Sequence, residues 1–285
     1  MSTTVITSAA NPLVKRIRLL SGDRRARRRE GAFAVEGVAP VWRAIEAGVD
    51  LEVVAVAPDL VAGTAAERLL AQATDAGVDV VHLSAELFGR LSGKEGPAGV
   101  LAIARGAVGP ISGLRVGPEA VVVALHEVAS PGNLGTVVRA AEAAGVDAVV
   151  TVGASTDFLA PAAVKAAMGS LFDLAVAHAD GLDAFFEWAA ANRLRVVTTS
   201  SRAETEHWEA DWTPPVGLLL GSEGDGLSDG ALARGDLQVR IPMAGRATSL
   251  NLAVAAGILI FQARRPALQG LPAAAHRGGQ GKMRR

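Results

Sequence analysis

The feature that most constrains the fold is a four-residue phrase, Ala-Gly-Val-Asp, which recurs at residues 47–50, 76–79 and 144–147. Each copy follows a stretch with helical spacing and precedes a valine-rich run, such as LEVVAVA at residues 51–57. A glycine at a helix end can adopt the left-handed conformation that releases the chain into a strand. Helices that alternate with buried strands in this way indicate an α/β fold with a largely parallel sheet.

A segment rich in glycine and proline, GAVGPISGLRVGP, interrupts this alternation between Arg105 and Glu119. Segments of this composition commonly join domains. We therefore expect two α/β domains, residues 1–105 and 119–265, joined by a linker at residues 106–118. Apolar runs predict strands at residues 33–35, 52–57, 79–83, 99–104, 120–125, 147–152, 172–177, 195–199, 216–220 and 237–241.

The composition removes several classes of site. The chain contains no cysteine, which excludes disulfides, thiolate metal sites and cysteine nucleophiles. Its five histidines have no spacing typical of metal ligands, so we predict no metal. The opening residues do not resemble a signal peptide, and the most apolar run, Leu250 to Phe261, is too short to span a bilayer. We therefore expect a cytoplasmic protein with no membrane contact.

Positive charge is concentrated in two short segments. Eight basic residues lie between Lys15 and Arg29 and six between Arg264 and Arg285, which together make half of the 28 in the chain. Codon bias explains a high arginine total but not this clustering. The first cluster is either a solvated helix surface or a site for a polyanion, because arginine suits phosphate. Residues 266–285 have no core-forming pattern and are predicted to be a basic, disordered tail.

Three loops stand out because each follows a predicted strand, where open parallel sheets bind their ligands. They are HEVASPGNLGTVVRAAEAAG at 126–145, LLLGSEGDGLSDG at 218–230 and IPMAGRATSLNLAVAAGILIF at 241–261. Ser249 and Asn251 stand at the start of the helix in the third loop, and we expect this pair to belong to an active site. The first loop also contains Asn133 and Arg139, and the second contains Glu223. Taken singly, Asn133 is also explained as a helix cap and Glu223 as part of a glycine-rich turn.

Two familiar nucleotide-binding motifs are missing from the sequence. The GSEGDG stretch does not fit G-x-G-x-x-G, and it follows a late strand, whereas a dinucleotide fingerprint normally opens its domain. The P-loop pattern G-x-x-x-x-G-K-[ST] is absent as well. Dinucleotide-dependent and P-loop chemistry are therefore disfavoured.

In order and spacing, the three loops resemble the three motifs of the SpoU (TrmH-like) family of RNA ribose 2′-O-methyltransferases, in the SPOUT superfamily. The resemblance extends over residues 119–265. The stretches SAANPLVKRIRLL and GAFAVEGVAPVWRAIEAG are similar to the L30e-like substrate-binding domain that often precedes such a catalytic domain. The resemblance implies an L30e-like α/β domain followed by a trefoil-knotted SPOUT α/β domain with a mostly parallel sheet.

The resemblance also implies a homodimer and the cofactor S-adenosylmethionine, held in a bent shape by the second and third loops. The residues implied to contact the cofactor, largely through main-chain atoms, are Gly221, Ile241, Met243 and Leu250. Main-chain amides and carbonyls can recognise adenine while apolar side chains keep the pocket dry. The sequence therefore needs no polar cofactor signature.

Roles for the polar residues follow from the same resemblance. Asn133, Ser249 and Asn251 would hold the nucleotide and the loops by neutral hydrogen bonds, which do not repel a cationic cofactor. Arg139 would bind phosphate and stabilise negative charge on the ribose oxygen. Because a guanidinium stays protonated, we leave the proton acceptor open. Glu223 is either that base or a brace that accepts backbone hydrogen bonds, and we favour the brace.

RNA becomes the expected partner of the first basic cluster once a ribose-methylating domain follows it. The residues predicted to contact RNA are Lys15, Arg16, Arg24, Arg25, Arg27, Arg28, Arg29 and Lys165. We expect ribosomal RNA, 23S rRNA in particular, as the substrate, with transfer RNA as the alternative. The competing hypotheses are a catalytically silent RNA-binding protein and a class I methyltransferase that acts on a small molecule.

Three positions depart from the family pattern. Ser130 stands where Asp is common, and Lys165 and Ala167 stand where Arg and a hydroxyl residue are common. Lys165 keeps the positive charge but lacks the bidentate fork of arginine, so we expect weaker phosphate positioning there.

Overall fold

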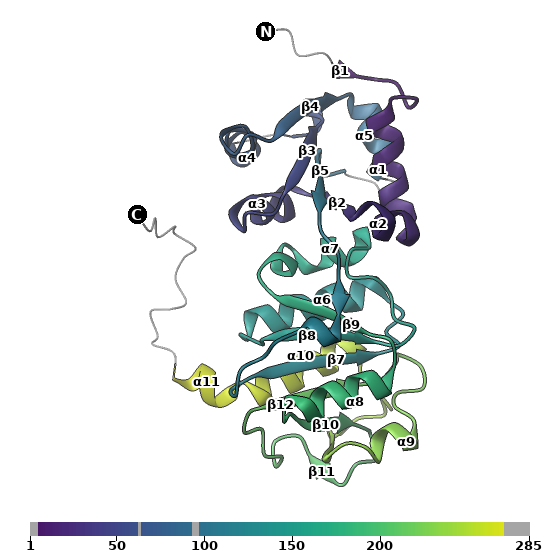
Figure 1. The fold of residues 1–285 in the computed structure, drawn as a ribbon, viewed down its shortest axis with the longest axis vertical. Coiled ribbons are helices and arrows are strands. Elements are labelled where there is room, and N and C mark those ends of the chain that lie inside the picture. The colour runs from purple at the N-terminus through teal and green to yellow at the C-terminus, as the bar shows by residue number, and fades with distance from the viewer. Residues whose placement is uncertain (1–4, 62–63, 93–96, 271–285) are drawn as a thin grey trace.

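The computed structural model describes residues 5–61, 64–92 and 97–270. Figure 1 shows two α/β units stacked along the long axis of the molecule, with the N-terminal unit at the top. The first unit is built on a five-stranded sheet and the second on an eight-stranded sheet. Both are α/β, as the alternation of helices and strands predicts.

The N-terminal sheet has the strand order β1-β4-β3-β5-β2. Its strands are β1 (Val5–Ile6), β2 (Ala32–Glu36), β3 (Leu51–Val56), β4 (Asp79–Leu83) and β5 (Val100–Arg105). The helices around it are α1 (Pro12–Gly22), α2 (Arg24–Glu30), α3 (Val38–Glu46), α4 (Thr64–Asp75) and α5 (Ala85–Ser92), with a 3₁₀ turn, η1 (Pro58–Leu60). β5 runs antiparallel to β2 and β3, whereas β1, β4 and β3 are parallel. Periodicity identifies strands but not their direction, so the sequence did not predict this mixed sheet.

The C-terminal sheet has the strand order β11-β13-β10-β12-β7-β8-β9-β6, and every recorded pairing in it is parallel. Its strands are β6 (Gly109–Pro110), β7 (Val121–His126), β8 (Ala148–Val152), β9 (Ala175–Ala179), β10 (Arg195–Thr199), β11 (Thr205–Glu206), β12 (Val216–Leu220) and β13 (Leu237–Arg240). The helices are α6 (Pro131–Ala143), α7 (Pro161–Ala167), α8 (Leu182–Ala191), α9 (Asp229–Leu232), α10 (Leu252–Ala263) and α11 (Arg265–Gln269), with 3₁₀ turns η2 (Ile111–Gly113) and η3 (Ser170–Phe172). The mostly parallel sheet predicted for this half is confirmed.

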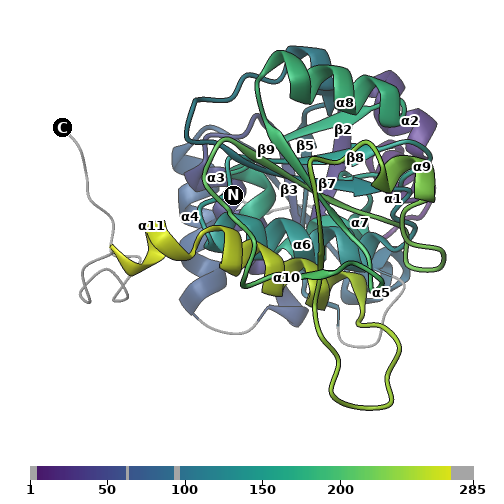
Figure 2. The ribbon, with the colours of Figure 1, turned by 90° about the horizontal axis from the view of Figure 1, so that it is seen from below.

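Helices cover both faces of the C-terminal sheet, α8 on one side and α6 with α10 on the other (Figure 2). Successive side chains along β7 point to opposite faces of the sheet and pack against both helix layers. Val121 and Val123 belong to the core under α6 and α10, whereas Val122 and Ala124 belong to the core under α8. Because both faces are buried, the strand is apolar throughout, which is typical of parallel sheets.

The recurring Ala-Gly-Val-Asp phrase behaves as the sequence predicts. Gly48, Gly77 and Gly145 have φ angles of 68°, 74° and 69°, so each adopts the left-handed conformation at a helix end. A side chain at these positions would be strained, whereas glycine adopts the conformation readily.

The structure corrects several boundaries. β9 begins at Ala175, not near residue 172, because Ser170–Phe172 forms the turn η3. The segment at 106–118 is more than a linker, since β6 extends the C-terminal sheet beside β9 and Ile111 is buried in its core. In the predicted disordered tail, residues up to Gln269 belong to the short helix α11, and residues 271–285 lie outside the described residues.

The two units share a packed interface. Phe33 of β2 stacks on Phe172 of η3 with ring centroids 6.4 Å apart. Arg27 of α2 is 5% exposed, and its Nε and Nη2 donate to Asp157 Oδ2 at 2.9 and 2.8 Å. Its Nη1 donates to the Leu20 carbonyl, 2.8 Å away. All three guanidinium nitrogens of Arg27 are therefore used inside the protein.

Candidate active site

The loops that follow β7 and β12 are held together by one carboxylate. Glu223 accepts hydrogen bonds from the backbone N–H groups of Ala129 and Ser130, at 3.0 and 3.1 Å. It also accepts one from Asn133 Nδ2, at 3.0 Å. Because β7 and β12 are adjacent parallel strands, their carboxyl ends meet at one edge, and Glu223 spans the two loops there.

The third loop joins the cluster through a second amide. Asn251 Nδ2 donates to Asn133 Oδ1, 3.1 Å away, while Asn251 Oδ1 caps α10 by accepting from Ala253 N at 2.8 Å. Ser130 caps α6 in the same way, with its Oγ accepting from Asn133 N at 3.3 Å. Helices α6 and α10 therefore begin side by side. We call the connected set Glu223, Asn133 and Asn251 the polar cluster.

The environment of Glu223 decides which role its carboxylate can fill. Burial acts to raise its pKa, but the hydrogen bonds from Ala129, Asn133 and Ser130 outweigh burial and lower the pKa. The group is therefore ionised at neutral pH, and its acceptor sites are occupied by amides. A weakly basic carboxylate with occupied oxygens is better suited to bracing loops than to accepting a proton.

A cavity of about 310 Å³ borders the polar cluster at the carboxyl ends of β10, β12 and β13. Six of the residues predicted for the active site line it, namely Gly221, Glu223, Ile241, Met243, Ser249 and Leu250. Its size lies at the lower end of the range for small-molecule sites. The lining combines apolar side chains such as Leu220 and Leu259 with two carboxylates, Glu223 and Asp225, and two guanidinium groups, Arg202 and Arg240. This lining fits a cofactor with an apolar body that carries both positive and negative charge.

Gly221 shapes this cavity. A Cβ atom there would lie 2.0 Å from the carbonyl carbon of Gly226 and 2.4 Å from the nitrogen of Leu227. Since both are backbone atoms, the turn from Gly221 to Leu227 can close only around a residue without a side chain.

Two predicted catalytic residues do not join the polar cluster. Arg139 is exposed on α6, and no hydrogen bond or ion pair of its guanidinium is recorded among the described residues. It does not line the cavity either. Ser249 is exposed and lines the cavity without a recorded bond to Asn133 or Asn251. Both side chains are open to a ligand.

The sequence analysis missed a fourth loop that contributes to the cavity. Thr199, the last residue of β10, lines it with Ser200 and Arg202 from the following loop and with Arg240 at the end of β13. No motif marks this stretch. Its position after a predicted strand at 195–199 was the one signal that pointed to it.

Comparisons with known proteins agree with this geometry. Residues 120–261 match the model of the SpoU rRNA Methylase family, and residues 11–102 match the MRM3-like substrate binding domain. A 23S rRNA (uridine(2479)-2′-O)-methyltransferase of Streptomyces viridochromogenes is 30% identical over 257 residues, 88% of each chain. The chain belongs to the SpoU rRNA methylase family. The family resemblance inferred from the three loops is thus confirmed.

Other SpoU relatives match along nearly their full length. The 23S rRNA (guanosine(2553)-2′-O)-methyltransferase RlmP of Bacillus subtilis is 28% identical over 91% of this chain and 98% of its own. The crystal structure of an AdoMet-bound rRNA methyltransferase from Sinorhizobium meliloti superposes with a TM-score of 0.82 at 32% identity. The superposition covers 95% of this chain and 99% of that one. Both units of the fold, and not the methylase unit alone, therefore have counterparts in the SpoU family.

The predicted RNA-contacting residues of this SpoU-family chain divide into two groups. Lys15, Arg25, Arg28, Arg29 and Lys165 are exposed. Arg16, by contrast, pairs with Glu30 and with both oxygens of Glu52, which raises its pKa further above the usual arginine value. Arg27 is buried against Asp157, and Arg24 Nη1 donates to the Ser155 carbonyl at 2.9 Å. Arg16 and Arg27 thus stabilise the protein and are withdrawn from the predicted RNA surface.

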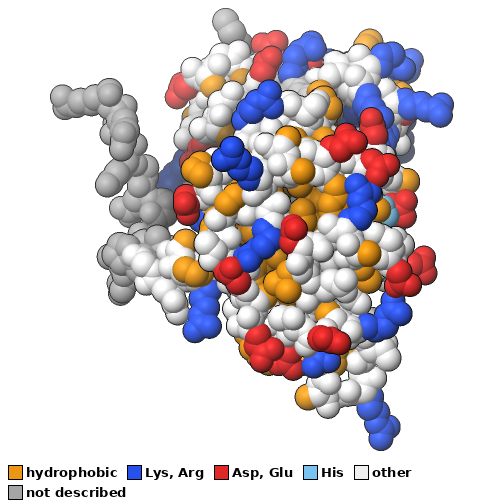
Figure 3. All heavy atoms as spheres, turned by 60° about the horizontal axis from the view of Figure 1, so that its bottom comes forward, with side chains coloured by type: hydrophobic (Ala, Val, Ile, Leu, Met, Phe, Trp, Pro, Cys, Tyr) orange, Lys and Arg blue, Asp and Glu red, His pale blue; other side chains and the backbone are white. Residues whose placement is uncertain are grey.

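Within the described residues, positive charge is most concentrated along α2. The lower face of the molecule mixes basic and acidic side chains around a patch of hydrophobic ones (Figure 3). On α2, by contrast, five of seven residues are arginine, in the sequence RRARRRE.

No helix within residues 5–61, 64–92 and 97–270 is long and apolar enough to cross a membrane. In the same ranges no three His, Asp or Glu side chains are grouped as metal ligands would be.

Two departures from the SpoU pattern have simple local explanations. Ser130 still caps α6, so the serine preserves the function that an aspartate would have there. Ala167 is 1% exposed and packs in the core, where a hydroxyl would need a buried partner.

Proposed function

We propose that this SpoU-family protein transfers a methyl group from S-adenosylmethionine to the 2′-hydroxyl of a ribose in 23S ribosomal RNA. The observation that carries the proposal is the polar cluster of Glu223, Asn133 and Asn251 beside a cofactor-sized cavity. It occurs in a chain whose relatives over nearly full length include two 23S rRNA 2′-O-methyltransferases. Transfer RNA remains the alternative substrate, while the family match removes the class I small-molecule hypothesis.

The cavity is the proposed cofactor site, with main-chain atoms at Gly221, Ile241, Met243 and Leu250 as the contacts. The bound cofactor supplies a methyl group activated on a sulfonium. The chain positions the acceptor: Asn133, Asn251 and Ser249 would orient the ribose with neutral hydrogen bonds. Such positioning is worth up to roughly 7–11 kcal/mol in favourable systems. Glu223 is proposed as the brace for the loops, so the proton acceptor stays open.

Arg139 is proposed to contact the phosphate next to the target ribose and to stabilise negative charge on the reacting oxygen. Its exposed guanidinium, with no recorded partner among the described residues, supports this role. Residues 1–105 are proposed as the RNA-binding domain and residues 119–265 as the methyltransferase domain. The trefoil knot stays a prediction. We also propose a cytoplasmic location, where ribosomal RNA is found.

The proposed activity is tested by incubation with methyl-labelled cofactor and total RNA, followed by mapping of the label. We expect label on one ribose of 23S rRNA, detected as resistance to alkaline cleavage at that position. Label on transfer RNA would favour the alternative substrate. RNA binding without label would instead support a catalytically silent protein.

The homodimer is proposed on a surface of α10. Val254, Ile258 and Phe261 are 51%, 37% and 47% exposed and follow helical spacing, so they form one apolar stripe. Monomeric proteins rarely expose contiguous apolar surface of this kind. A second copy of the chain would cover it.

Charged residues on the α10 stripe are expected to separate the dimer. The double change Val254→Lys and Phe261→Lys should reduce the mass in light scattering from about twice 29.1 kDa to 29.1 kDa, because two unpaired charges would be buried in the interface. Met168→Lys alters another exposed hydrophobic residue, 44% exposed, and should leave the mass unchanged. A wild-type protein that is monomeric at micromolar concentration would contradict the proposal.

A further inference from the structure

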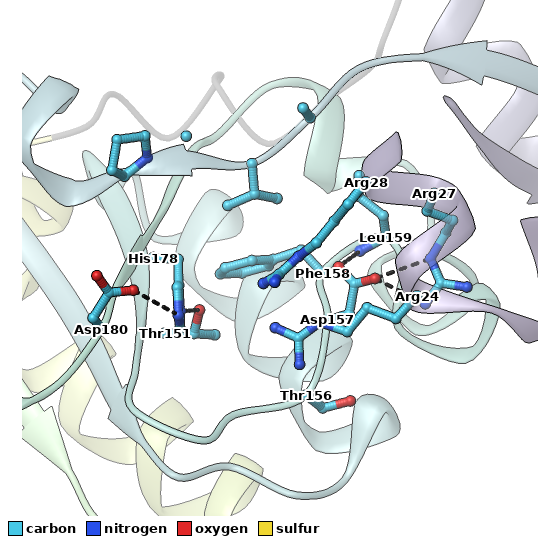
Figure 4. A pocket seen from close by; sticks show the side chains of 14 residues that line it. Arg24, Arg27, Arg28, Thr151, Thr156, Asp157, Phe158, Leu159, His178 and Asp180 are labelled. Carbon is cyan, nitrogen blue, oxygen red and sulfur yellow. Dashed lines mark hydrogen bonds and ion pairs between the residues drawn. The ribbon is translucent and has the colours of Figure 1, made fainter. Parts of the chain in front are cut away.

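A second cavity lies where the two units of the fold meet. Its volume is about 280 Å³, and its walls come from α2, from the segment 107–110 and from the loops after β8 and β9. Figure 4 shows Arg24, Arg27 and Arg28 entering from α2, with His178, Thr151 and Asp180 on the opposite side. The cofactor site accounts for none of these residues.

The cavity contains more positive than negative charge. Arg27 and Asp157 neutralise each other, because both Nε and Nη2 of Arg27 bind that carboxylate. Arg24 has one bond, from Nη1 to the Ser155 carbonyl, and its Nε is buried without a partner in the part of the chain that the structure describes. Arg28 reaches into the cavity from α2 (Figure 4), and no bond of its guanidinium is recorded in that part. Two guanidinium groups therefore face one exposed carboxylate, Asp180.

His178 lies opposite the arginines in this cavity. Its Nδ1 forms a hydrogen bond with Thr151 Oγ1 at 3.1 Å, which fixes the ring, and Nε2 lies 3.8 Å from Asp180 Oδ1. Burial lowers the pKa of His178, and the positive charges of Arg24 and Arg28 lower it further despite Asp180. In the tautomer with its proton on Nε2, a neutral imidazole donates one hydrogen bond. Together with the charged N–H groups of Arg24 and Arg28 it forms a donor set that suits a phosphate.

The cavity also lies in line with the proposed methyl-transfer site. Thr156 N donates to the Val128 carbonyl at 2.8 Å, so the loop after β8 packs directly on the loop whose amides bind Glu223. β9 is two strands from β7, which places their ends roughly 10 Å apart. One RNA strand laid along this edge of the sheet reaches both places within a few nucleotides.

We propose that this second cavity, between the two units, holds a backbone phosphate of the substrate RNA, bound by Arg24 and Arg28 and faced by His178. The attached nucleoside lies against the apolar wall formed by Val108, Pro110 and Phe158. The proposal rests on the proposed RNA substrate and makes it more specific. It places Arg28 in a defined phosphate-binding site, whereas Arg25 and Arg29 attract RNA only by their charge.

Arg25 provides a matched control, because it is an exposed arginine of the same helix that does not line the cavity. Arg28→Ala is expected to raise the Kd for a 23S rRNA fragment about tenfold at physiological salt, through loss of charge-assisted hydrogen bonds. Arg25→Ala is expected to raise it about twofold, by the general loss of one positive charge. Cofactor affinity should be unchanged in both. Equal Kd values for the two variants would overturn the site.

Proton NMR of the histidine rings provides a second readout, since the chain has five histidines and His178→Gln identifies the signal of His178. A short RNA oligonucleotide should shift this signal in the wild-type protein but not in Arg28→Ala. A shift with inorganic phosphate and none with RNA would overturn the RNA assignment. If the wild-type protein methylates RNA but Arg25→Ala and Arg28→Ala bind RNA equally well, the phosphate site is refuted and the proposed function is not. Wild-type protein that methylates no RNA would refute the proposed function instead.

Discussion

Replacing Arg139 with alanine is expected to lower the rate of methyl transfer by about 100- to 1,000-fold, the usual cost of losing a group that stabilises an oxyanion. The affinity for S-adenosylmethionine should stay within about threefold, because Arg139 does not line the proposed cofactor cavity. Single-turnover kinetics with saturating RNA measure the rate, and calorimetry measures cofactor binding. The two readouts separate catalysis from cofactor binding.

Arg139→Lys is the matched control for this prediction. Lysine keeps the positive charge but not the bidentate fork, so an intermediate rate is expected. Because Arg139 is exposed on α6, both variants are expected to fold as the wild type does, and thermal unfolding checks this directly. A wild-type rate in Arg139→Ala would refute the assignment of this residue to the reacting oxygen.

The fold was predictable from the sequence where the local backbone conformation requires one residue type. Gly48, Gly77 and Gly145 mark helix ends because a left-handed residue is needed there, and the buried strands follow at once. The boundary of β9 was not predictable in this way. The run from Phe172 to Ala177 is apolar enough for a strand, but its start is used for the turn η3, where Phe172 packs on Phe33 of the other unit.

The meeting of the three loops was predictable for a topological reason. Parallel strands place their carboxyl ends at one edge, so Asn133, Glu223 and Asn251 were expected close together, and the hydrogen bonds join them. The sequence could not give the partners of Glu223. Its bonds to the amides of Ala129 and Ser130 involve main-chain groups, which leave no trace in residue identity.

The basic cluster at Lys15 to Arg29 shows what composition cannot predict. Composition indicated its positive charge but not which arginines are free to bind RNA. Arg27 pairs with Asp157, 130 residues away, and Arg16 pairs with Glu52, 36 residues away. Ion pairs of such sequence separation have no periodic signature, so only the folded chain separates structural from available arginines.

Replacing Gly221 with alanine is expected to weaken S-adenosylmethionine binding by about 100-fold. The added methyl group would lie 2.0 Å from the Gly226 carbonyl carbon, 2.3 Å from the Gly226 oxygen and 2.4 Å from the Leu227 nitrogen. A backbone cannot yield as a flexible side chain does, so the turn from Gly221 to Leu227 must open. That turn forms one wall of the proposed cofactor cavity. Isothermal titration of the cofactor measures the loss.

Gly224→Ala is the control, because Gly224 lies in the same turn, also lines the cavity, and has no heavy atom within 4 Å of an added Cβ. It also lacks a left-handed φ, so alanine is unstrained there. Its cofactor affinity should stay within about twofold of wild type. The two variants make the same chemical change three residues apart in the sequence, so a difference between them isolates the closure of the turn. If both bind the cofactor as the wild type does, the cavity is not the cofactor site, and the placement of the methyl group beside the polar cluster falls with it.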